Sequence, residues 1–445
     1  MGAIFVYLFF LLSCLIALAM PAIGCAAFYF FNLLDPAWNW RWAIPEDPGF
    51  QKWIALSILL GFITQQGWRS SMSRTSVLTL GLLLSFLLLC FLSSLNSAYP
   101  SKTEFYLDML WRIVLIVAIS LVLTVTENRA MLLAVGCVLG QAYNSFQINL
   151  EYIQLGFCRY AYAANWGMKG LDNNTYSILT IPILALSIAF VLTRWKWWLR
   201  GIAAGICLLQ IHQLMMMESR GSMLGAILTA SLAVWYCPKS PVTNTILIAG
   251  GTLVVLLAGP PVIREFASSF GAEEQLDVSA ESRFYLWKAG AAIIWEYPWL
   301  GVGPGCSSAF VPLYYDFDAM KAQNEKALHN LFFEIMCENG VIAGTIYFSF
   351  FLLPWGMVWI NRRRFFRENP KQCALALGVI AGTPGYLLAS MFSSGSLIES
   401  SYVLPIIGCA LLSIRPISTD DEETDFLSGT IEEDLPSSAK VMQQA

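Results

Sequence analysis

The chain has 445 residues, of which 57% are hydrophobic and 13% are Asp, Glu, Lys or Arg. Soluble domains carry about 25% charged residues, so this composition excludes an ordinary soluble enzyme, a disordered protein and a basic nucleic-acid binder. The formal net charge of -4 says little about the body of the chain, because the last 30 residues alone hold eight acids and one Lys. The composition fits a helical membrane protein.

Apolar runs recur along most of the chain, and about 20 apolar residues make one membrane span. They lie near 3–34, 52–66, 75–95, 109–125, 130–150, 174–193, 199–217, 220–236, 243–262, 330–358, 373–391 and 398–414. No Lys or Arg precedes Arg41, so the first run lacks the basic start of a cleaved signal and is expected to be a membrane segment. This run breaks at Pro21 and Gly24, which predicts either one kinked helix or a pair of half-helices. We therefore expect an all-α, polytopic integral membrane protein with about 12 transmembrane helices, or 13 with the N-terminus across the membrane.

Basic residues in alternate connections set the expected orientation, because cytoplasmic loops carry an excess of Lys and Arg. These residues are Arg69, Arg74, Arg129, Arg194, Lys196, Arg200, Lys239, Arg362, Arg363, Arg364, Arg367 and Lys371. The other side, which we expect to be periplasmic, has longer connections near 35–51, 96–108, 151–173 and 263–329. Only the last of these is long enough to fold, so any chemistry is expected on the periplasmic face.

The expected organisation has four parts. N-terminal transmembrane helices occupy 1–262, a large periplasmic loop containing amphipathic helices occupies 263–329, C-terminal transmembrane helices occupy 330–415, and 416–445 forms a disordered acidic cytoplasmic tail. Most of the eleven Cys lie inside apolar runs, where Cys acts as a small hydrophobe, so we expect neither a disulfide framework nor a zinc site.

Arg220 stands between two apolar runs on the predicted outer face, after Glu218 and Ser219. An Arg immersed in hydrocarbon costs about 2.5–3.5 kcal/mol, so it either snorkels to headgroups or faces a polar cavity. Gly221, with Ser222 and Gly225, makes a small helix face that allows close approach.

Arg283, next to Ser282, stands at the start of a predicted helix. Apolar positions at 284, 287, 291, 294 and 295 have a helical period, which predicts an amphipathic helix on the outer leaflet with Trp287 and Trp295 on one side. The segment Tyr297–Gly305 then has four breakers in five residues, which predicts a tight loop with exposed backbone donors.

His329 and Asn330 begin the next span, with Glu338 further in. An imidazole titrates near pH 6.5, so His329 can accept a proton from a hydroxyl, although a lone interfacial His is more often structural. The other His, His212, lies mid-span among apolar residues, which indicates a structural role. Asp316 and Asp318 resemble a metal-holding Asp-x-Asp pair, but nucleotide sugars are not available outside the cytoplasm, so we expect no metal site.

Together these pieces resemble the O-antigen ligase and polymerase superfamily over about residues 215–345. The matching residues are Ser219-Arg220-Gly221, Ser282-Arg283, Trp287, Tyr297-Pro298-Trp299-Leu300-Gly301-Val302-Gly303-Pro304-Gly305, His329-Asn330 and Glu338-Asn339-Gly340. The stretch Asn32 to Phe50 is also similar to the O-glycosylation ligases associated with exosortase systems. The acidic tail and the acidic 265–281 segment depart from the pattern and bear on the acceptor.

The resemblance implies a glycosyltransferase of the bacterial inner membrane, working in O-antigen, lipopolysaccharide or other polysaccharide biosynthesis. It would move a glycan from undecaprenyl (polyprenyl) diphosphate to a hydroxyl of lipid A-core, a glycan or a protein, without metal, cofactor or nucleic acid. Arg220 and Arg283 would bind the diphosphate, His329 would be the catalytic base, and Ser219, Ser282, Trp287, Asn330 and Glu338 would support them. A polymerase with a second lipid-linked repeat as acceptor, and a transporter of a lipid-linked or anionic substrate, remain alternatives.

Overall fold

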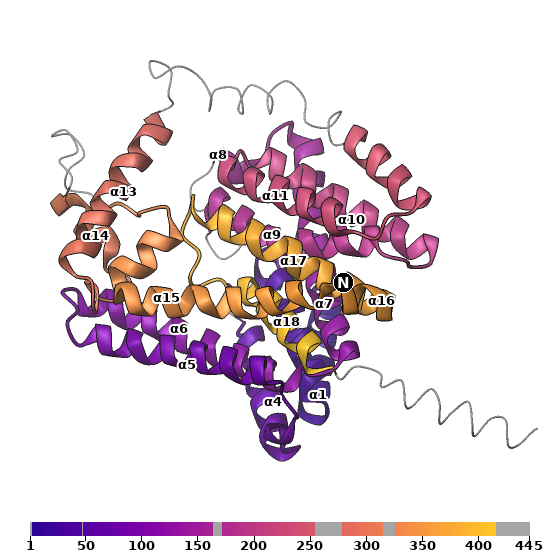
Figure 1. The fold of residues 1–445 in the computed structure, drawn as a ribbon, viewed down its shortest axis with the longest axis horizontal. Coiled ribbons are helices and arrows are strands. Elements are labelled where there is room, and N and C mark those ends of the chain that lie inside the picture. The colour runs from indigo at the N-terminus through magenta and orange to yellow at the C-terminus, as the bar shows by residue number, and fades with distance from the viewer. Residues whose placement is uncertain (1, 47, 163–170, 254–277, 315–324, 415–445) are drawn as a thin grey trace, which may run out of the picture. The chain divides into compact units, whose positions relative to one another are not determined.

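The computed structural model describes residues 2–46, 48–162, 171–253, 278–314 and 325–414, and its regular elements in these ranges are all helices (Figure 1). Eight of these helices are long and apolar enough to cross a membrane: α1 (Gly2–Ala19), α5 (Arg74–Ser94), α6 (Pro100–Leu123), α7 (Glu127–Leu155), α9 (Asn173–Leu192), α10 (Trp197–Met216), α15 (Leu331–Ile360) and α17 (Pro370–Ser390). The predicted all-α class is confirmed for the described residues. The count of about 12 spans stays a prediction.

Shorter helices complete the described chain. They are α2 (Pro21–Leu34), α3 (Pro36–Asn39), α4 (Phe50–Thr64), α8 (Arg159–Tyr162), α11 (Arg220–Tyr236), α13 (Val278–Glu296), α14 (Ser307–Tyr314), α16 (Arg362–Glu368) and α18 (Val403–Ser413), with 3-10 turns η1 (Gly67–Arg69) and η4 (Glu399–Tyr402). Residues 241–253 are helical too. Parts of the predicted periplasmic loop, at 263–277 and 315–324, and the predicted tail at 416–445 lie outside the described residues.

The first apolar run is a pair of helices folded back on each other. The ring of Phe9 in α1 lies 5.5 Å from the rings of both Phe30 and Phe31 in α2. One continuous helix would hold residues 21 positions apart at about 30 Å. Of the two alternatives for this run, the pair of half-helices is therefore correct, and the chain reverses at Met20–Pro21.

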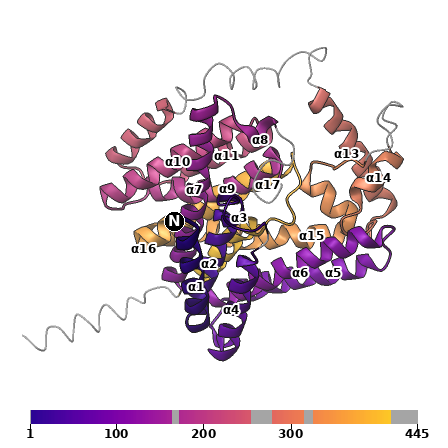
Figure 2. The same ribbon diagram turned by 180° about the vertical axis from the view of Figure 1, so that it is seen from behind.

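A group of tightly packed helices forms the centre of the described fold. In α9, every residue from Tyr176 to Leu192 is buried, as expected for an apolar helix surrounded by others. It packs against α10, α11 and α17, and both ribbon views show α17 beside α9 and α11 (Figures 1 and 2). A Cβ on Gly225 of α11 would lie 2.6 Å from the carbonyl oxygen of Gly385 in α17. The small face predicted on α11 therefore receives α17, backbone against backbone.

Hydrogen bonds gather the predicted periplasmic connections at one end of the helices, here called the site end. Asn173 donates to the carbonyl oxygen of Met217 at 2.8 Å, and the hydroxyls of Thr175 and Ser393 lie 3.3 Å apart. At the other end, the basic end, the Asn369 amide donates to Glu127 at 2.8 Å. Connections predicted to lie on one side of the membrane are thus found together at one end of the helices in these contacts. The compartment that each end faces stays a prediction.

Helix α15 is broken at Gly340, whose φ of 83° and ψ of 168° are not helical. The segment Tyr297–Gly305 fills this break. The N–H groups of Val302 and Gly303 donate to the carbonyl oxygens of Cys337 (2.8 Å) and Glu338 (3.0 Å), and the N–H of Val341 donates to Pro298 (2.8 Å). The prediction of a tight loop with exposed donors is wrong for the N–H groups of Val302 and Gly303, because they pair with the backbone of α15.

Helix α13 packs on the protein through a face of mostly small and aliphatic residues. Its buried residues include Leu286, Ala289 and Ile293, whereas Phe284 and Trp295 are exposed. A Cβ on Gly290 would lie 3.1 Å from Leu328 and 3.3 Å from Phe333. Small residues therefore allow α13 to approach α15, and the predicted contact of its aromatic face with the outer leaflet stays a prediction.

Candidate functional site

Arg220 is the first residue of α11, and the start of α9 holds it in place. The buried Ser219 side chain donates to Asn174 at 2.9 Å and to Ser222 at 3.1 Å. Glu218 before it has a φ of 52°, a left-handed conformation that turns the chain sharply between α10 and α11. Ser219 therefore fixes the corner from which α11 starts, and its role in supporting Arg220 in the site stays a prediction.

Phe392, after the end of α17, links the two arginine-bearing helices. A Cβ on Gly221 of α11 would lie 2.3 Å from the Cβ of Phe392, so only Gly fits there. The ring of Phe392 also lies 6.1 Å from that of Trp287 in α13. Arg220 and Arg283, far apart in sequence, thus belong to two helices that contact the same side chain.

Trp287 connects α13 to the start of α15. Its ring stacks on Phe333 with centroids 6.3 Å apart and an interplanar angle of 29°. The indole N–H is buried and has no hydrogen-bond partner among the described residues. Trp287 thus lies between the two predicted arginine positions and the chain that carries His329.

Asn330 caps α15 and thereby positions His329. Its buried side-chain oxygen accepts from the N–H groups of Phe332 (2.9 Å) and Phe333 (3.2 Å). His329, immediately before the cap, has a φ of 48°, which is uncommon for a residue with a side chain. Because His329 has this backbone conformation directly before a buried cap, the backbone sets the direction of its side chain.

Charges around His329 favour the neutral imidazole. Burial lowers the pKa of His329 below its ordinary value, the positive charges of Arg283 and Lys326 lower it further, and the negative charge of Asp172 opposes them. At neutral pH the ring is therefore uncharged and can accept a proton. The influence of Arg283 also shows that the structure brings two of the predicted site residues near each other.

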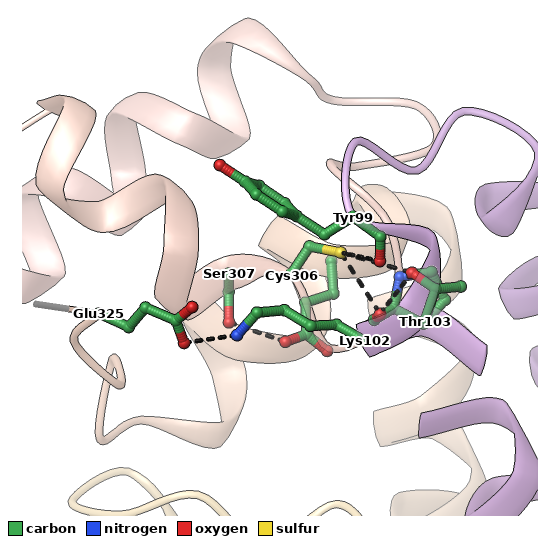
Figure 3. A network of polar contacts seen from close by, with 8 residues as sticks. Tyr99, Lys102, Thr103, Cys306, Ser307 and Glu325 are labelled. Carbon is green, nitrogen blue, oxygen red and sulfur yellow. Dashed lines mark hydrogen bonds and ion pairs between the residues drawn. The ribbon is translucent and has the colours of Figure 1, made fainter. Parts of the chain in front are cut away.

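A network at the start of α6 tethers the segment that leads to His329 (Figure 3). Lys102 forms an ion pair with Glu325, and the Thr103 hydroxyl donates to the carbonyl oxygen of Pro304 at 2.9 Å. The N–H of Lys326 also donates to the carbonyl oxygen of Ser308 at 3.0 Å. Residues 325–330 are thus held by Lys102 and Ser308 at one end and by the Asn330 cap at the other.

Glu338 belongs to this network rather than to the surroundings of His329. Its buried carboxylate accepts from the Ser307 hydroxyl at 2.7 Å, and its carbonyl oxygen accepts from Ser93 at 2.8 Å. Glu338 lies seven residues beyond Leu331, the first residue of α15, which is about 10 Å along the helix. Glu338 lies beside the break in α15, and its supporting role in the site stays a prediction. Ser282 lies in α13 with its side chain outside the described part.

Two residues at this end were missed by sequence reasoning. Asp172 caps α9 by accepting from the N–H of Thr175 at 2.7 Å, and its position before two Asn and a Thr is a recognisable cap signal. No sequence pattern singled out Phe392, because its importance comes from contacts with residues that are distant in the sequence.

Two predictions concerned other sites. His212 lies near the C-terminal end of α10 with its Nδ1 atom 2.5 Å from Asn149, and its structural role stays a prediction. The described residues contain no group of three His, Cys, Asp or Glu that could hold a metal. Asp316 and Asp318 lie outside the described residues.

Comparison with protein families gives one match in this part of the chain. Residues 205–348 match the family model described as O-antigen ligase. Residues 205–348, called the ligase domain below, are thus similar to the O-antigen ligase family and make up less than half of the chain. The domain contains Arg220, Arg283 and His329 and agrees with the 215–345 stretch that carried the resemblance. It supports a glycan-handling enzyme of the O-antigen ligase and polymerase type in a multi-pass membrane protein, with lipid-linked glycans as the general substrate class. A search of curated proteins found no match for the chain.

Proposed function

We propose that the protein transfers a glycan from a polyprenyl diphosphate to an acceptor hydroxyl at its site end, and that this end faces the periplasm across the bacterial inner membrane. The observation that carries the proposal is the meeting of three parts of the ligase domain. Helices α11 and α13 both contact Phe392, and the charge of Arg283 acts on His329.

In this proposal Arg220 and Arg283 bind the diphosphate of the donor. Negative charge grows on the diphosphate oxygens as the bond to the sugar breaks, and a guanidinium donates paired hydrogen bonds to such oxygens. The buried indole N–H of Trp287, between the two helices, provides a further donor for a diphosphate oxygen. No divalent ion is needed, because two fixed positive charges neutralise the leaving group.

His329 accepts the proton of the acceptor hydroxyl. The acceptor oxygen then forms a bond to the anomeric carbon of the glycan, and the bond between that carbon and the diphosphate oxygen breaks. The polyprenyl diphosphate leaves with the electron pair. The lowered pKa of His329 keeps the ring neutral for this step, and Arg283 both lowers that pKa and stabilises the departing charge.

Reconstituted transfer tests this proposal. The purified protein in nanodiscs is mixed with a polyprenyl-diphosphate-linked oligosaccharide and, in separate reactions, with lipid A-core or a second lipid-linked repeat as acceptor. We expect a glycosylated acceptor and free polyprenyl diphosphate in equal amounts, lost in His329→Ala and kept in His212→Gln. Uptake of the donor without any bond cleavage would support the transporter alternative instead. Transfer only to the lipid-linked repeat would identify a polymerase.

A further inference from the structure

A cavity of about 200 Å³ lies outside the ligase domain, between the chain around α3 and the C-terminal half of α7. Its lining includes Trp38, Trp42, Asn144, Glu151 and Arg159. Drug-sized ligands occupy pockets of about 300–1,000 Å³, so this cavity suits a smaller molecule. Figure 2 shows α3 beside α7, and the stacked rings of Trp40 and Tyr143, 5.1 Å apart, join them.

Helix α7 presents one defined stripe to the cavity. Most of its residues follow helical spacing, and the α7 residues that line the cavity are Asn144, Gln147, Ile148, Leu150, Glu151, Gln154 and Leu155. The adjacent stripe faces α10, where Ser145 donates to Gln213 at 2.6 Å and Asn149 donates to Leu209 at 3.0 Å. The wall of the cavity is therefore part of a rigid helix, and it is fixed to the helix that leads into the ligase domain.

Aromatic rings form the rim of the cavity. The guanidinium of Arg41 lies 4.5 Å from the ring centroid of Trp38 and 5.8 Å from that of Trp42. The Trp42 side chain is 73% exposed, so its ring presents a face to the exterior. Indole faces at the mouth of a polar cavity suit a ligand with an apolar face and polar edges.

The floor and walls of the cavity are polar and carry charges of both signs, from Glu151, Arg41 and Arg159. Buried Asn39 donates to Asn144 at 2.6 Å, and Arg159 forms an ion pair with Glu151 at 2.8 Å. Amides and a carboxylate–guanidinium pair both donate and accept hydrogen bonds, as a ring of hydroxyl groups requires.

We propose that this cavity is a binding subsite for a single neutral sugar residue. The sugar would stack its apolar face on the rim tryptophans and direct its hydroxyls to the amides and to the Glu151–Arg159 pair. That the subsite recognises one residue of the donor or acceptor glycan rests on the proposed function. That the cavity binds a sugar is independent of the proposed function.

Saturation-transfer NMR on the full protein in nanodiscs tests the subsite with free glucose, galactose, rhamnose and N-acetylglucosamine as probes. We expect signal from at least one of these sugars, reduced fivefold or more in Trp42→Ala and in Glu151→Gln. Two matched controls should keep the full signal: Trp53→Ala, which removes another exposed tryptophan, and His329→Ala, which removes the proposed base.

The outcomes separate the subsite from the transfer reaction. Sugar signal that depends on Trp42 supports the subsite even if no glycan transfer is ever detected. Absence of signal from all four sugars, or equal signal in Trp42→Ala and Trp53→Ala, overturns it. Trp42-dependent signal from sn-glycerol 3-phosphate in place of the sugars would also overturn it, because the cavity would then hold a lipid headgroup.

Discussion

Gly340 should be the most sensitive glycine of α15, because the break at this residue holds the Tyr297–Gly305 loop. A Cβ at Gly340 would lie 2.1 Å from the carbonyl oxygen of Trp299, far inside contact distance. Its φ of 83° with ψ of 168° belongs to a region that only Gly adopts readily. Gly340→Ala therefore cannot keep both its own backbone conformation and the loop beside it.

The cost follows from the contacts that this break makes. Forcing a side chain into such a backbone conformation costs about 1–3 kcal/mol. Displacing the loop also removes three backbone hydrogen bonds between it and α15, each worth about 0.5–1.5 kcal/mol. We therefore expect Gly340→Ala to lower the free energy of unfolding by about 3–7 kcal/mol.

The same helix offers a matched control. A Cβ at Gly356 would meet nothing within 4 Å, and its backbone is helical. Gly356→Ala should leave stability unchanged or raise it by about 0.5–1 kcal/mol. Unfolding of both variants in mixed micelles, followed by circular dichroism during a titration with dodecyl sulfate, gives the two free energies. Equal stability of Gly340→Ala and Gly356→Ala would refute the account of the broken helix.

Three further predictions concern orientation, pH and metal. In a background without native Cys, Glu325→Cys should react with an impermeant maleimide in spheroplasts and Arg363→Cys only after permeabilisation; the reverse pattern would place the site end in the cytoplasm. The transfer rate should rise with pH through the lowered pKa of His329, below pH 6.5. Asp172→Asn should move this rise to still lower pH, because it removes the negative charge that raises the pKa of His329. A shift of the rise to higher pH would contradict the assignment of His329 as the base. Incubation with EDTA should leave the transfer rate unchanged, since guanidinium groups neutralise the leaving group; full loss restored by Mg²⁺ or Mn²⁺ would contradict this.

Sequence patterns predicted the local features of this protein well. Long apolar runs identified the membrane-length helices, because burying about 20 residues in lipid requires an apolar composition. Basic residues separated the two ends of the described helices. Arg220, Arg283 and His329 were singled out because a charged or titratable side chain at the edge of an apolar run requires an explanation, and their roles stay predictions.

Features that depend on distant contacts could not be predicted. Pro21 permits both a kink and a reversal, and the contacts of Phe9 with α2 decide between them. Gly340 lies in an apolar run that looks helical throughout, and only the inserted loop reveals the break. Phe392 is one aromatic residue among many until Gly221 and Trp287 meet on it.

The most direct test of the proposed mechanism compares donor binding with single-turnover transfer in the same purified variants. Arg220→Lys and Arg283→Lys should weaken binding of the polyprenyl-diphosphate donor and slow transfer, because Lys lacks the planar fork of the guanidinium. Arg112→Lys, a change at an exposed arginine paired with Asp108, is the matched control and should alter neither.

His329→Ala should keep donor binding nearly intact and slow transfer by about 10²–10⁴-fold or more, since a general base contacts the acceptor proton and not the diphosphate. If His329→Ala lost donor affinity as severely as the two arginine variants, His329 would belong to the diphosphate site and would not be the base. If all three variants kept full transfer, the assignment of this site would be wrong.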